Sequence, residues 1–306
     1  MDYQKILHEI EIEVAPSLGQ GAVADYIPIL SEANAEDFAM SVVTVAGDRF
    51  HVGRAATPFS IQSISKVFTL LVALERDGDA LWERVGREPS GTSFNSIVQL
   101  ERENGVPRNP FINAGALVVT DALISRCADE DPRDFLLAMM RRLSQSARVR
   151  IDAKVAESEK IWGDRNRSLA YFMKSFGVLE NRPEDILDTY FCQCALEMTT
   201  GELARAGLFL ANDGVDPLTS EKVAAHDAVN RINALMLTCG HYDRSGDFAF
   251  RVGLPGKSGV GGGILAVAPG VCAVAAWSPG LNEAGNSLSG SLALELFSAK
   301  TGLNLF

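Results

Sequence analysis

Phe59-Ser-Ile-Gln-Ser-Ile-Ser-Lys-Val-Phe-Thr-Leu70 joins a short polar stretch to the start of an apolar helix. Within it, Ser63 and Lys66 stand three residues apart, a spacing that places both side chains on one helix face, one turn from each other. Because apolar residues follow, Ser63 is expected near the favourable N-terminus of a buried helix. This stretch therefore predicts a serine hydroxyl held beside an amine.

A second segment strengthens this interpretation. Lys257-Ser258-Gly259 has the form K-[ST]-G, which together with an earlier S-x-x-K is typical of serine hydrolases that use a lysine instead of a histidine. S-x-x-K occurs only once in the chain, but a single match is weak evidence, because a surface lysine can also lie beside a helix-terminal serine. The two segments together predict Ser63 as nucleophile and Lys66 as its base.

For Lys66 to accept a proton, its amine must be neutral part of the time. Its pKa would have to fall from about 10.4 to near 8, which needs about 3 kcal/mol of differential stabilisation. Partial burial or a neighbouring cation can supply this, and Lys257 is the candidate cation.

The glycines of Lys257-Ser-Gly-Val-Gly-Gly-Gly-Ile264 lead into an apolar strand. Because a phosphate loop normally leads into a helix N-terminus, a nucleotide site is disfavoured. An edge strand that offers a backbone N–H to a developing oxyanion fits better, with the amide of Ser63 as its partner. A flexible entry to a hairpin is the simpler alternative.

Tyr242 lies in the polar loop 239–246 and can be either a proton relay to a leaving amine or an ordinary loop tyrosine. His51, His226 and His241 have no evident metal or triad partner. The pair Cys192-Gln-Cys194 resembles half of a metal site, but no second Cys/His pair accompanies it, so no metal is expected.

Length, composition and charge exclude several classes of protein. A chain of 306 residues, 47% hydrophobic and 22% charged, is long enough for one large domain or two intimate ones. Its net charge of −11 argues against nucleic-acid binding. The charged N-terminus and the lack of an apolar run of about 20 residues predict neither a secretory signal nor a membrane segment. Five scattered cysteines indicate reduced thiols, so we expect a cytoplasmic protein.

The pattern along the chain alternates between strand and helix character. A helix is predicted over 4–14, and a hairpin with strands 38–46 and 49–52 follows it. Further helices are predicted over 114–127, 131–145, 153–176, 183–195, 200–212, 219–237 and 288–300. Strands are expected at 248–252, 263–268 and 271–277.

Strands at both ends with helices between them predict an α+β fold. We expect a mostly antiparallel sheet built from both chain ends and flanked by helices, with an inserted helical domain. The sheet part would comprise about 1–62 and 240–306 and the helical part about 63–239, within one functional unit of residues 1–306. Ser63 then lies where the two parts meet, which is a common place for a binding cleft.

The assembled segments resemble the bacterial-type glutaminases, a family with the fold of serine β-lactamases and penicillin-binding proteins. The resemblance runs from about residue 20 to residue 290, with no departure at a site position of the family. It is carried by Ala24-Asp-Tyr-Ile-Pro28, Gln62-Ser-Ile-Ser-Lys66, Asn109-Pro-Phe-Ile-Asn-Ala-Gly-Ala116, Ser158-Glu159, Arg165-Asn166, Tyr190, Gly240-His-Tyr-Asp243 and Lys257-Ser-Gly-Val-Gly-Gly-Gly263.

This resemblance implies hydrolysis of L-glutamine to L-glutamate and ammonia through an ester on Ser63, with Lys66 as general base. The amides of Ser63 and Val260 would hold the oxyanion, and Tyr242 would help to protonate ammonia. The implied substrate contacts are Tyr26, Gln62, Ser63, Asn113, Glu159, Asn166, Tyr190, Tyr242 and Val260. The resemblance further implies no metal or organic cofactor and a homodimer or homotetramer.

These residue types suit a free amino acid as ligand. Glu159 can bind an ammonium group, whereas Asn113, Asn166 and a tyrosine hydroxyl can bind a carboxylate. Without the resemblance, simpler roles are open: an exposed helix position for Glu159, a helix cap for Asn113, and packing for Tyr26 and Tyr190.

Two other functions also remain open from the residues alone. One keeps the fold and changes the substrate, as in a β-lactamase-like or esterase-like serine hydrolase, although such enzymes usually act outside the cytoplasm. The other is a non-catalytic module that binds an amino acid, against which the intact set Ser63, Lys66 and Lys257 argues. The fold does not distinguish these functions.

Overall fold

The computed structural model describes residues 1–25, 27–90, 96–127 and 129–306. Its main sheet is antiparallel and has the strand order β2-β1-β8-β7-β6. The strands are β1 (Ala39–Thr44), β2 (Arg49–Gly53), β6 (Gly256–Ser258), β7 (Gly263–Ala268) and β8 (Cys272–Trp277). Because β1 pairs with β8, strands from the two chain ends form one sheet. The predicted α+β class and antiparallel sheet are therefore confirmed.

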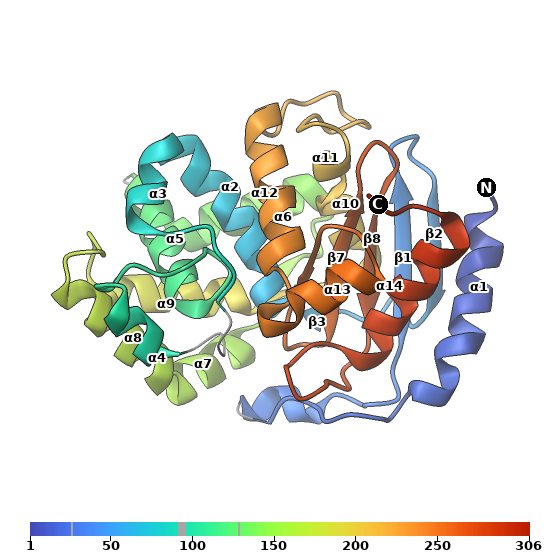
Figure 1. Ribbon diagram of the computed structural model, residues 1–306, viewed down its shortest axis with the longest axis horizontal. Helices are drawn as coiled ribbons and strands as arrows, with labels where there is room; N and C mark the ends of the chain where they lie inside the picture. The colour runs from blue at the N-terminus through green and yellow to red at the C-terminus, as the bar shows by residue number, and fades with distance from the viewer. Residues whose placement is uncertain (26, 91–95, 128) are drawn as a thin grey trace.

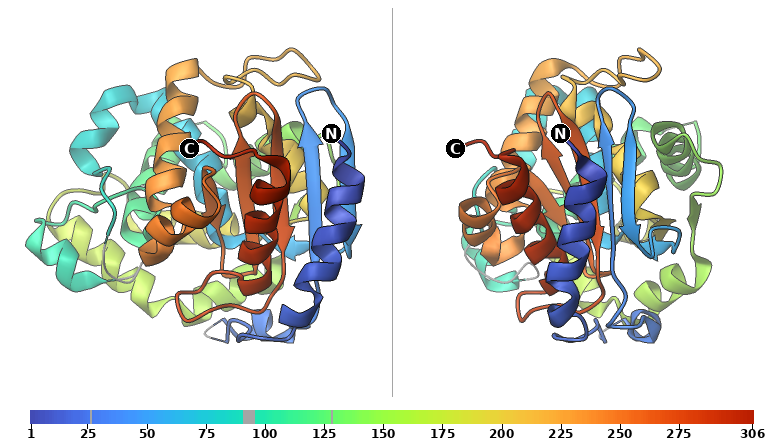
Figure 2. Two further views of the ribbon diagram at one scale, coloured as in Figure 1. Left: turned by 45° about the vertical axis from the view of Figure 1, so that its right-hand side comes forward. Right: turned by 90° about the vertical axis from the view of Figure 1, so that its right-hand side faces the viewer.

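Helices cover both faces of this sheet. On one face, α1 (Tyr3–Val14) and α14 (Leu288–Thr301) pack side by side, as Figure 2 shows, over buried residues such as Met40, Ile264 and Val274. Alternate residues of the same strands, such as Val43 and Leu265, belong to the core of the other face. Since neither face of β1, β7 and β8 is open to water, these three strands read as nearly continuous apolar runs.

The helical part packs against that second face and lies to the left in Figure 1. At its centre, α2 (Ser65–Asp77) packs against α5 (Asn113–Arg126). Residues 65–74 and 113–123 are buried on all sides, as expected for helices without a polar face. The other α-helices of this part are α3 (Leu81–Arg84), α4 (Ile97–Arg102), α6 (Pro132–Ser144), α7 (Ala153–Trp162), α8 (Asp164–Ser175), α9 (Pro183–Cys194), α10 (Thr200–Ala206), α11 (Leu208–Ala211) and α12 (His226–Cys239).

A second, smaller sheet was not predicted. It has the order β3-β5-β4 and consists of β3 (Phe59–Ser60), β4 (Arg150–Ile151) and β5 (Leu196–Met198). Strands of two or three residues are too short to show a periodic pattern. This sheet ends immediately before Ser63, and Ile61 N donates to Leu196 O at 2.8 Å, so it fixes the approach to that residue.

The predicted strand 248–252 is wrong, because these residues lie mainly in α13 (Ser245–Arg251). Phe248, Phe250 and Val252 alternate with other residues, which suggested a strand. Only Phe248 and Val252, one helical turn apart, are buried, whereas Phe250 is 90% exposed. Phe248 and Val252 are four residues apart, a spacing that places them on one face of a helix.

Three predicted helices have different bounds. The helix predicted over 153–176 is divided at Gly163, which ends α7 with φ −82° and ψ +20°, and α8 follows it. The helix predicted over 200–212 is divided at Gly207 into α10 and α11. The helix predicted over 219–237 begins only at His226, since the preceding residues form a turn closed by pairing of Val215 with Lys222. Within the described ranges, no helix is long and apolar enough to cross a membrane.

Candidate active site

Ser63 lies in a short 3-10 turn, Gln62–Ile64, between β3 and α2. Gln62 has a φ of +49°, a left-handed conformation that residues other than glycine rarely adopt. Such backbone strain costs about 1–3 kcal/mol and persists where surrounding contacts fix it, often at active sites. Here the hydroxyl of Ser65 donates to Gln62 O at 2.7 Å and holds the turn closed.

Lys66 is fully buried in the first turn of α2. Its Nζ donates to Asn113 Oδ1 at 2.8 Å and to Phe111 O at 3.2 Å. Burial lowers the pKa of Lys66 to about 8, while Cys194 and Glu159 act in the opposite direction. The sequence left two possible causes, partial burial and a neighbouring cation; of these, burial lowers the pKa of Lys66. Near pH 8 about half of the Lys66 amine is therefore neutral and able to accept a proton.

Lys257 and Tyr242 lie together beside Ser63. Lys257, in β6, is fully buried, and its Nζ lies 4.5 Å from the centroid of the Tyr242 ring. Burial and, secondarily, the charge of Lys66 hold the pKa of Lys257 well below its usual range. The two lysines thus interact electrostatically, and the effect is a lowered pKa of Lys257.

Tyr242 has a φ of +57° and a buried side chain. Burial raises the pKa of Tyr242 to about 12, and hydrogen bonding with the side chains of Ser63 and Ser258 partly offsets this effect. The phenol therefore keeps its proton at neutral pH and lies within hydrogen-bond reach of Ser63.

Asn113 links two other predicted substrate contacts, Tyr190 and Asn166, to Lys66. Its Oδ1 accepts from Lys66 and, at 3.3 Å, from the hydroxyl of Tyr190, and its Nδ2 donates to Asn166 Oδ1 at 2.9 Å. These residues come from α5, α9 and α8, so the network crosses the helical part. Asn113 is the first residue of α5 and its side chain does not cap the helix; the simpler role of a cap is thus wrong.

Glu159, on α7, is buried and not an exposed helix position. Burial raises the pKa of Glu159 to about 7, while hydrogen bonding with Gln62 and the charge of Lys66 lower it. A buried acid next to the strained turn of Ser63 is a group whose charge responds to pH in the neutral range.

The loop after Lys257 lies backbone to backbone against the Ser63 turn. A Cβ at Gly259 would lie 2.5 Å from Ile61 O and 3.3 Å from Ser63 N, and one at Gly261 would lie 2.2 Å from Ser60 O. Only glycine permits such close approach. Val260 is carried between these glycines and is buried, and β6 is an edge strand, as predicted.

The structure thus brings together Gln62, Ser63, Lys66, Asn113, Glu159, Asn166, Tyr190, Tyr242 and Val260; Tyr26 lies outside the described residues. A serine hydroxyl, an amine that can be neutral and a protonated phenol converge beside two backbone segments. These groups together can carry out acyl transfer through a serine ester. In the part of the chain that the structure describes, no group of three or more His, Cys, Asp or Glu side chains is placed to hold a metal ion.

Two further residues, Cys194 and Asn286, lie beside this site and are not indicated by any sequence pattern. Cys194 is buried at the end of α9, and burial raises the pKa of its thiol well above the usual range while Lys66 and hydrogen bonding with Tyr190 lower it. Asn286 binds Ser258 through its side chain. Neither has a sequence signal, because Cys194 resembles any buried thiol and Asn286 lies in an ordinary polar turn.

Comparisons with known proteins point to one family. The family model described as Glutaminase matches residues 21–306. A glutaminase of Sinorhizobium fredii is 56% identical over 305 residues, covering 100% of this chain and 97% of that protein. The solved structure of the probable glutaminase ybaS has a TM-score of 0.92 at 38% identity, covering 99% of this chain and 97% of that one. The covalent complex of Bacillus subtilis glutaminase YbgJ with 5-oxo-L-norleucine, formed by reaction with 6-diazo-5-oxo-L-norleucine, has a TM-score of 0.88 at 35% identity, covering 100% of both chains.

Proposed function

The chain belongs to the glutaminase family, and on this basis we propose that it hydrolyses L-glutamine to L-glutamate and ammonia through a covalent ester on Ser63. The observation that carries the serine mechanism is the buried Lys66, one helical turn from Ser63, with a pKa of about 8. The covalent adduct of the Bacillus subtilis relative supports a route through an enzyme-bound intermediate. The lactamase-like, esterase-like and purely binding alternatives have no comparable support.

Acylation begins when the neutral amine of Lys66 takes the proton of Ser63. The serine oxygen then attacks the side-chain carbonyl carbon of glutamine, and negative charge develops on the carbonyl oxygen. We assign the amides of Ser63 and Val260 as its donors, because the 259–261 backbone lies directly against the Ser63 turn. Each such donor contributes about 10²–10³-fold in rate.

Collapse of this intermediate breaks the carbon–nitrogen bond and releases ammonia. The nitrogen needs one proton, which Tyr242 supplies from its neutral phenol; the proton that Lys66 took from Ser63 then restores the phenol. Water next attacks the ester with Lys66 again as base. Glutamate leaves, and Ser63 regains its proton.

The polar groups around the Ser63 turn bind the free amino acid. Glu159, as a carboxylate, pairs with the substrate ammonium. The amides of Asn113 and Asn166 and the hydroxyl of Tyr190, already one network, bind the substrate carboxylate. Gln62, Tyr242 and Val260 contact the substrate side chain in this proposal; the family resemblance adds Tyr26, which lies outside the described residues.

We expect kcat/KM for glutamine to rise with pH between about 6.5 and 8.5 and to level off above that. Lys66 must be neutral, which holds above its pKa of about 8, and Glu159 must be charged, which holds above its pKa of about 7. Steady-state rates across this range check the expectation. A rate that falls through this window would contradict the assignment of Lys66 as base.

Glu159→Gln should raise KM for glutamine about 10–100-fold, because the substrate ammonium loses a charged partner. The same variant should be more stable above pH 7. A carboxyl whose pKa is raised from 4.5 to about 7 keeps its proton when folded and loses it when unfolded, so stability falls as pH rises through this window. The shift corresponds to at most about 3 kcal/mol, which the neutral amide removes.

Denaturant unfolding of both proteins at pH 4.5 and pH 8 measures this change in stability. The free-energy difference between wild type and Glu159→Gln should be larger at pH 8. A difference that does not depend on pH, or an unchanged KM, would contradict the role given to Glu159.

We also propose that residues 1–306 act as one glutaminase unit, formed from the sheet part (1–62 and 240–306) and the helical part (63–239). A homodimer or homotetramer is supported by the exposed Ile161, Trp162, Tyr171 and Phe176 on or next to α7 and α8. A cytoplasmic location is supported by five free cysteines. No metal, organic cofactor or nucleic acid is part of the proposed activity.

The decisive assay is ammonia release from L-glutamine by the purified protein, with L-asparagine as a second substrate. Release from glutamine supports the function. A folded protein that releases no ammonia from glutamine, but hydrolyses a chromogenic lactam or an ester, would replace it with the lactamase-like or esterase-like function; binding of glutamine without turnover would replace it with the binding module.

A further inference from the structure

Asn286 lies in the loop between β8 and α14, which carries none of the residues proposed for catalysis. Its side chain is nevertheless only 2% exposed and reaches the back of the active site. Oδ1 of Asn286 accepts from Ser258 Oγ at 2.6 Å, and Nδ2 donates to His241 O at 3.3 Å. One amide therefore bridges β6, which carries Lys257, and the segment that carries Tyr242.

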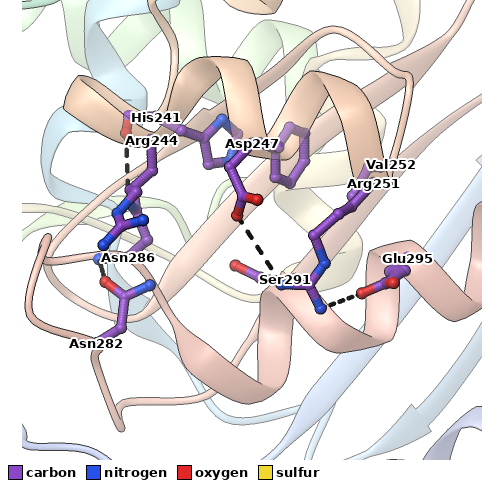
Figure 3. Close-up of a pocket in the computed structure, with 10 residues that line it drawn as sticks. His241, Arg244, Asp247, Arg251, Val252, Asn282, Asn286, Ser291 and Glu295 are labelled. Atoms are coloured by element: carbon purple, nitrogen blue, oxygen red, sulfur yellow. Dashed lines mark hydrogen bonds and ion pairs between the residues drawn. The ribbon is translucent and has the colours of Figure 1, made fainter. Parts of the chain in front are cut away.

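The loop itself holds Asn286 in place. Asn286 N donates to Asn282 Oδ1 at 3.1 Å, and Asn282 N donates to Asn286 O at 2.8 Å. Figure 3 shows Asn286 between the His241 carbonyl and Asn282, beside a cavity of about 50 Å³. The loop thus holds the backbone of Asn286, while its side-chain amide binds Ser258 and the His241 carbonyl.

The orientation of the Asn286 amide follows from its partners. The His241 carbonyl can only accept a hydrogen bond, so the nitrogen of Asn286 must face it. The oxygen of Asn286 must then face Ser258. Because that oxygen can only accept, the single hydroxyl proton of Ser258 is directed to Asn286 Oδ1 at 2.6 Å, with Gly240 O as a second acceptor at 3.3 Å, and away from Tyr242.

The phenol of Tyr242 interacts with both Ser63 and Ser258. Toward Tyr242, the Ser258 oxygen can act only as an acceptor. The place of Ser258 beside the phenol is thus set by Asn286. The second bond of Asn286, to His241 O, stabilises the backbone next to Tyr242, whose φ of +57° needs external support.

We infer that Asn286 is a positioning residue for the departure of ammonia: it orients Ser258 and the Tyr242 backbone so that the phenol proton meets the leaving nitrogen. The step is the one described above, in which the phenol gives its proton to nitrogen as the carbon–nitrogen bond breaks and regains one from Lys66. The inference rests on the proposed function.

The test compares two substrates that differ in whether the leaving group needs a proton. Glutamine releases ammonia, which does, whereas the γ-(p-nitrophenyl) ester of glutamate releases a nitrophenolate, which does not. Asn286→Ala should lower kcat for glutamine about 10–100-fold, since two buried hydrogen bonds are lost, and change KM less than about threefold. On the ester its kcat should stay within about threefold of wild type.

Four further proteins complete the experiment, among them Ser258→Ala alone. Glu283→Ala changes an exposed side chain of the same loop and should change neither rate appreciably. Asn286→Leu keeps the side-chain shape and serves if the alanine variant does not fold. Adding Ser258→Ala to Asn286→Ala should cost less than the product of the single effects, because both act on one proton.

Equal losses on glutamine and ester, or fully multiplicative effects with Ser258→Ala, would overturn the inference and leave Asn286 as a purely structural residue. Failure of the proposed function is recognised separately, because the wild type would then release no ammonia from glutamine.

Discussion

We expect Ser63→Ala to lower kcat for glutamine by about 10⁶-fold, which is the scale seen when the nucleophile of a serine hydrolase is removed. Without the hydroxyl, the carbonyl of glutamine has no covalent partner, and neutral Lys66 can only assist a direct attack by water. The residual rate would come from the oxyanion donors and substrate binding. Ammonia release at pH 8.5, where Lys66 is mostly neutral, measures the loss.

The fold should tolerate this substitution. Ser63 lies in a turn held by main-chain bonds and by Ser65, and alanine only removes one buried oxygen. An unchanged melting temperature is the control. 6-Diazo-5-oxo-L-norleucine should label wild type on Ser63 and leave Ser63→Ala unlabelled. Labelling of a cysteine in both proteins, together with near-normal turnover of the variant, would rule out the serine mechanism.

Lys66→Arg and Lys66→Met should each lower kcat by about 10²–10⁴-fold, the range of a lost general base. Arginine keeps the positive charge but cannot become neutral, because the guanidinium pKa exceeds 12. Methionine is neutral but cannot accept a proton. If Lys66 acted only as a fixed charge, the arginine variant would stay active and the methionine variant alone would fail.

The pH dependence of kcat/KM further separates Lys66 as a general base from Lys66 as a fixed charge. In both variants the rise of kcat/KM near pH 8 should disappear, because the group with a pKa of about 8 is gone. The control is glutamine binding by calorimetry, which should weaken much less than kcat. An arginine variant within tenfold of wild type would contradict the role of Lys66 as base.

The sequence predicts the parts of the fold that repeat a pattern over many residues. The hairpin of β1 and β2, the apolar strands β7 and β8, and helices such as α5 and α14 follow from periodicity. What it misses depends on tertiary contacts. In the small sheet, β5 pairs with β3 and β4, which are distant in the sequence (Met198 with Phe59, Glu197 with Arg150), and α13 buries Phe248 and Val252 against the sheet core while exposing Phe250.

The candidate site divides in the same way. Ser63, Lys66 and Lys257 belong to recognisable motifs, and the requirement that Lys66 have a pKa near 8 follows from its chemistry. Glu159, Asn113, Asn166 and Tyr190 come from four helices, and nothing local in the sequence sets them apart from ordinary polar or packing residues. They were assigned through the family resemblance, and only the three-dimensional arrangement joins them to Lys66.

The buried charged groups imply a conflict between stability and activity. The pKa of Lys66 is lowered and that of Glu159 is raised by burial, so each is destabilised in its charged form. Left-handed backbone at Gln62 and Tyr242 adds strain at the same place. Such a site is retained because proton transfer at neutral pH requires it.

The central claim is that Ser63 carries a glutamyl ester during turnover, and its most direct test is acid quenching of the enzyme in saturating L-glutamine, followed by peptide mass spectrometry. The account predicts that the peptide containing Ser63 gains the mass of glutamine minus ammonia, that this adduct disappears when glutamine is exhausted, and that Ser63→Ala shows none. An enzyme that turns over rapidly with no adduct on Ser63, or with the adduct on another residue, would contradict the account.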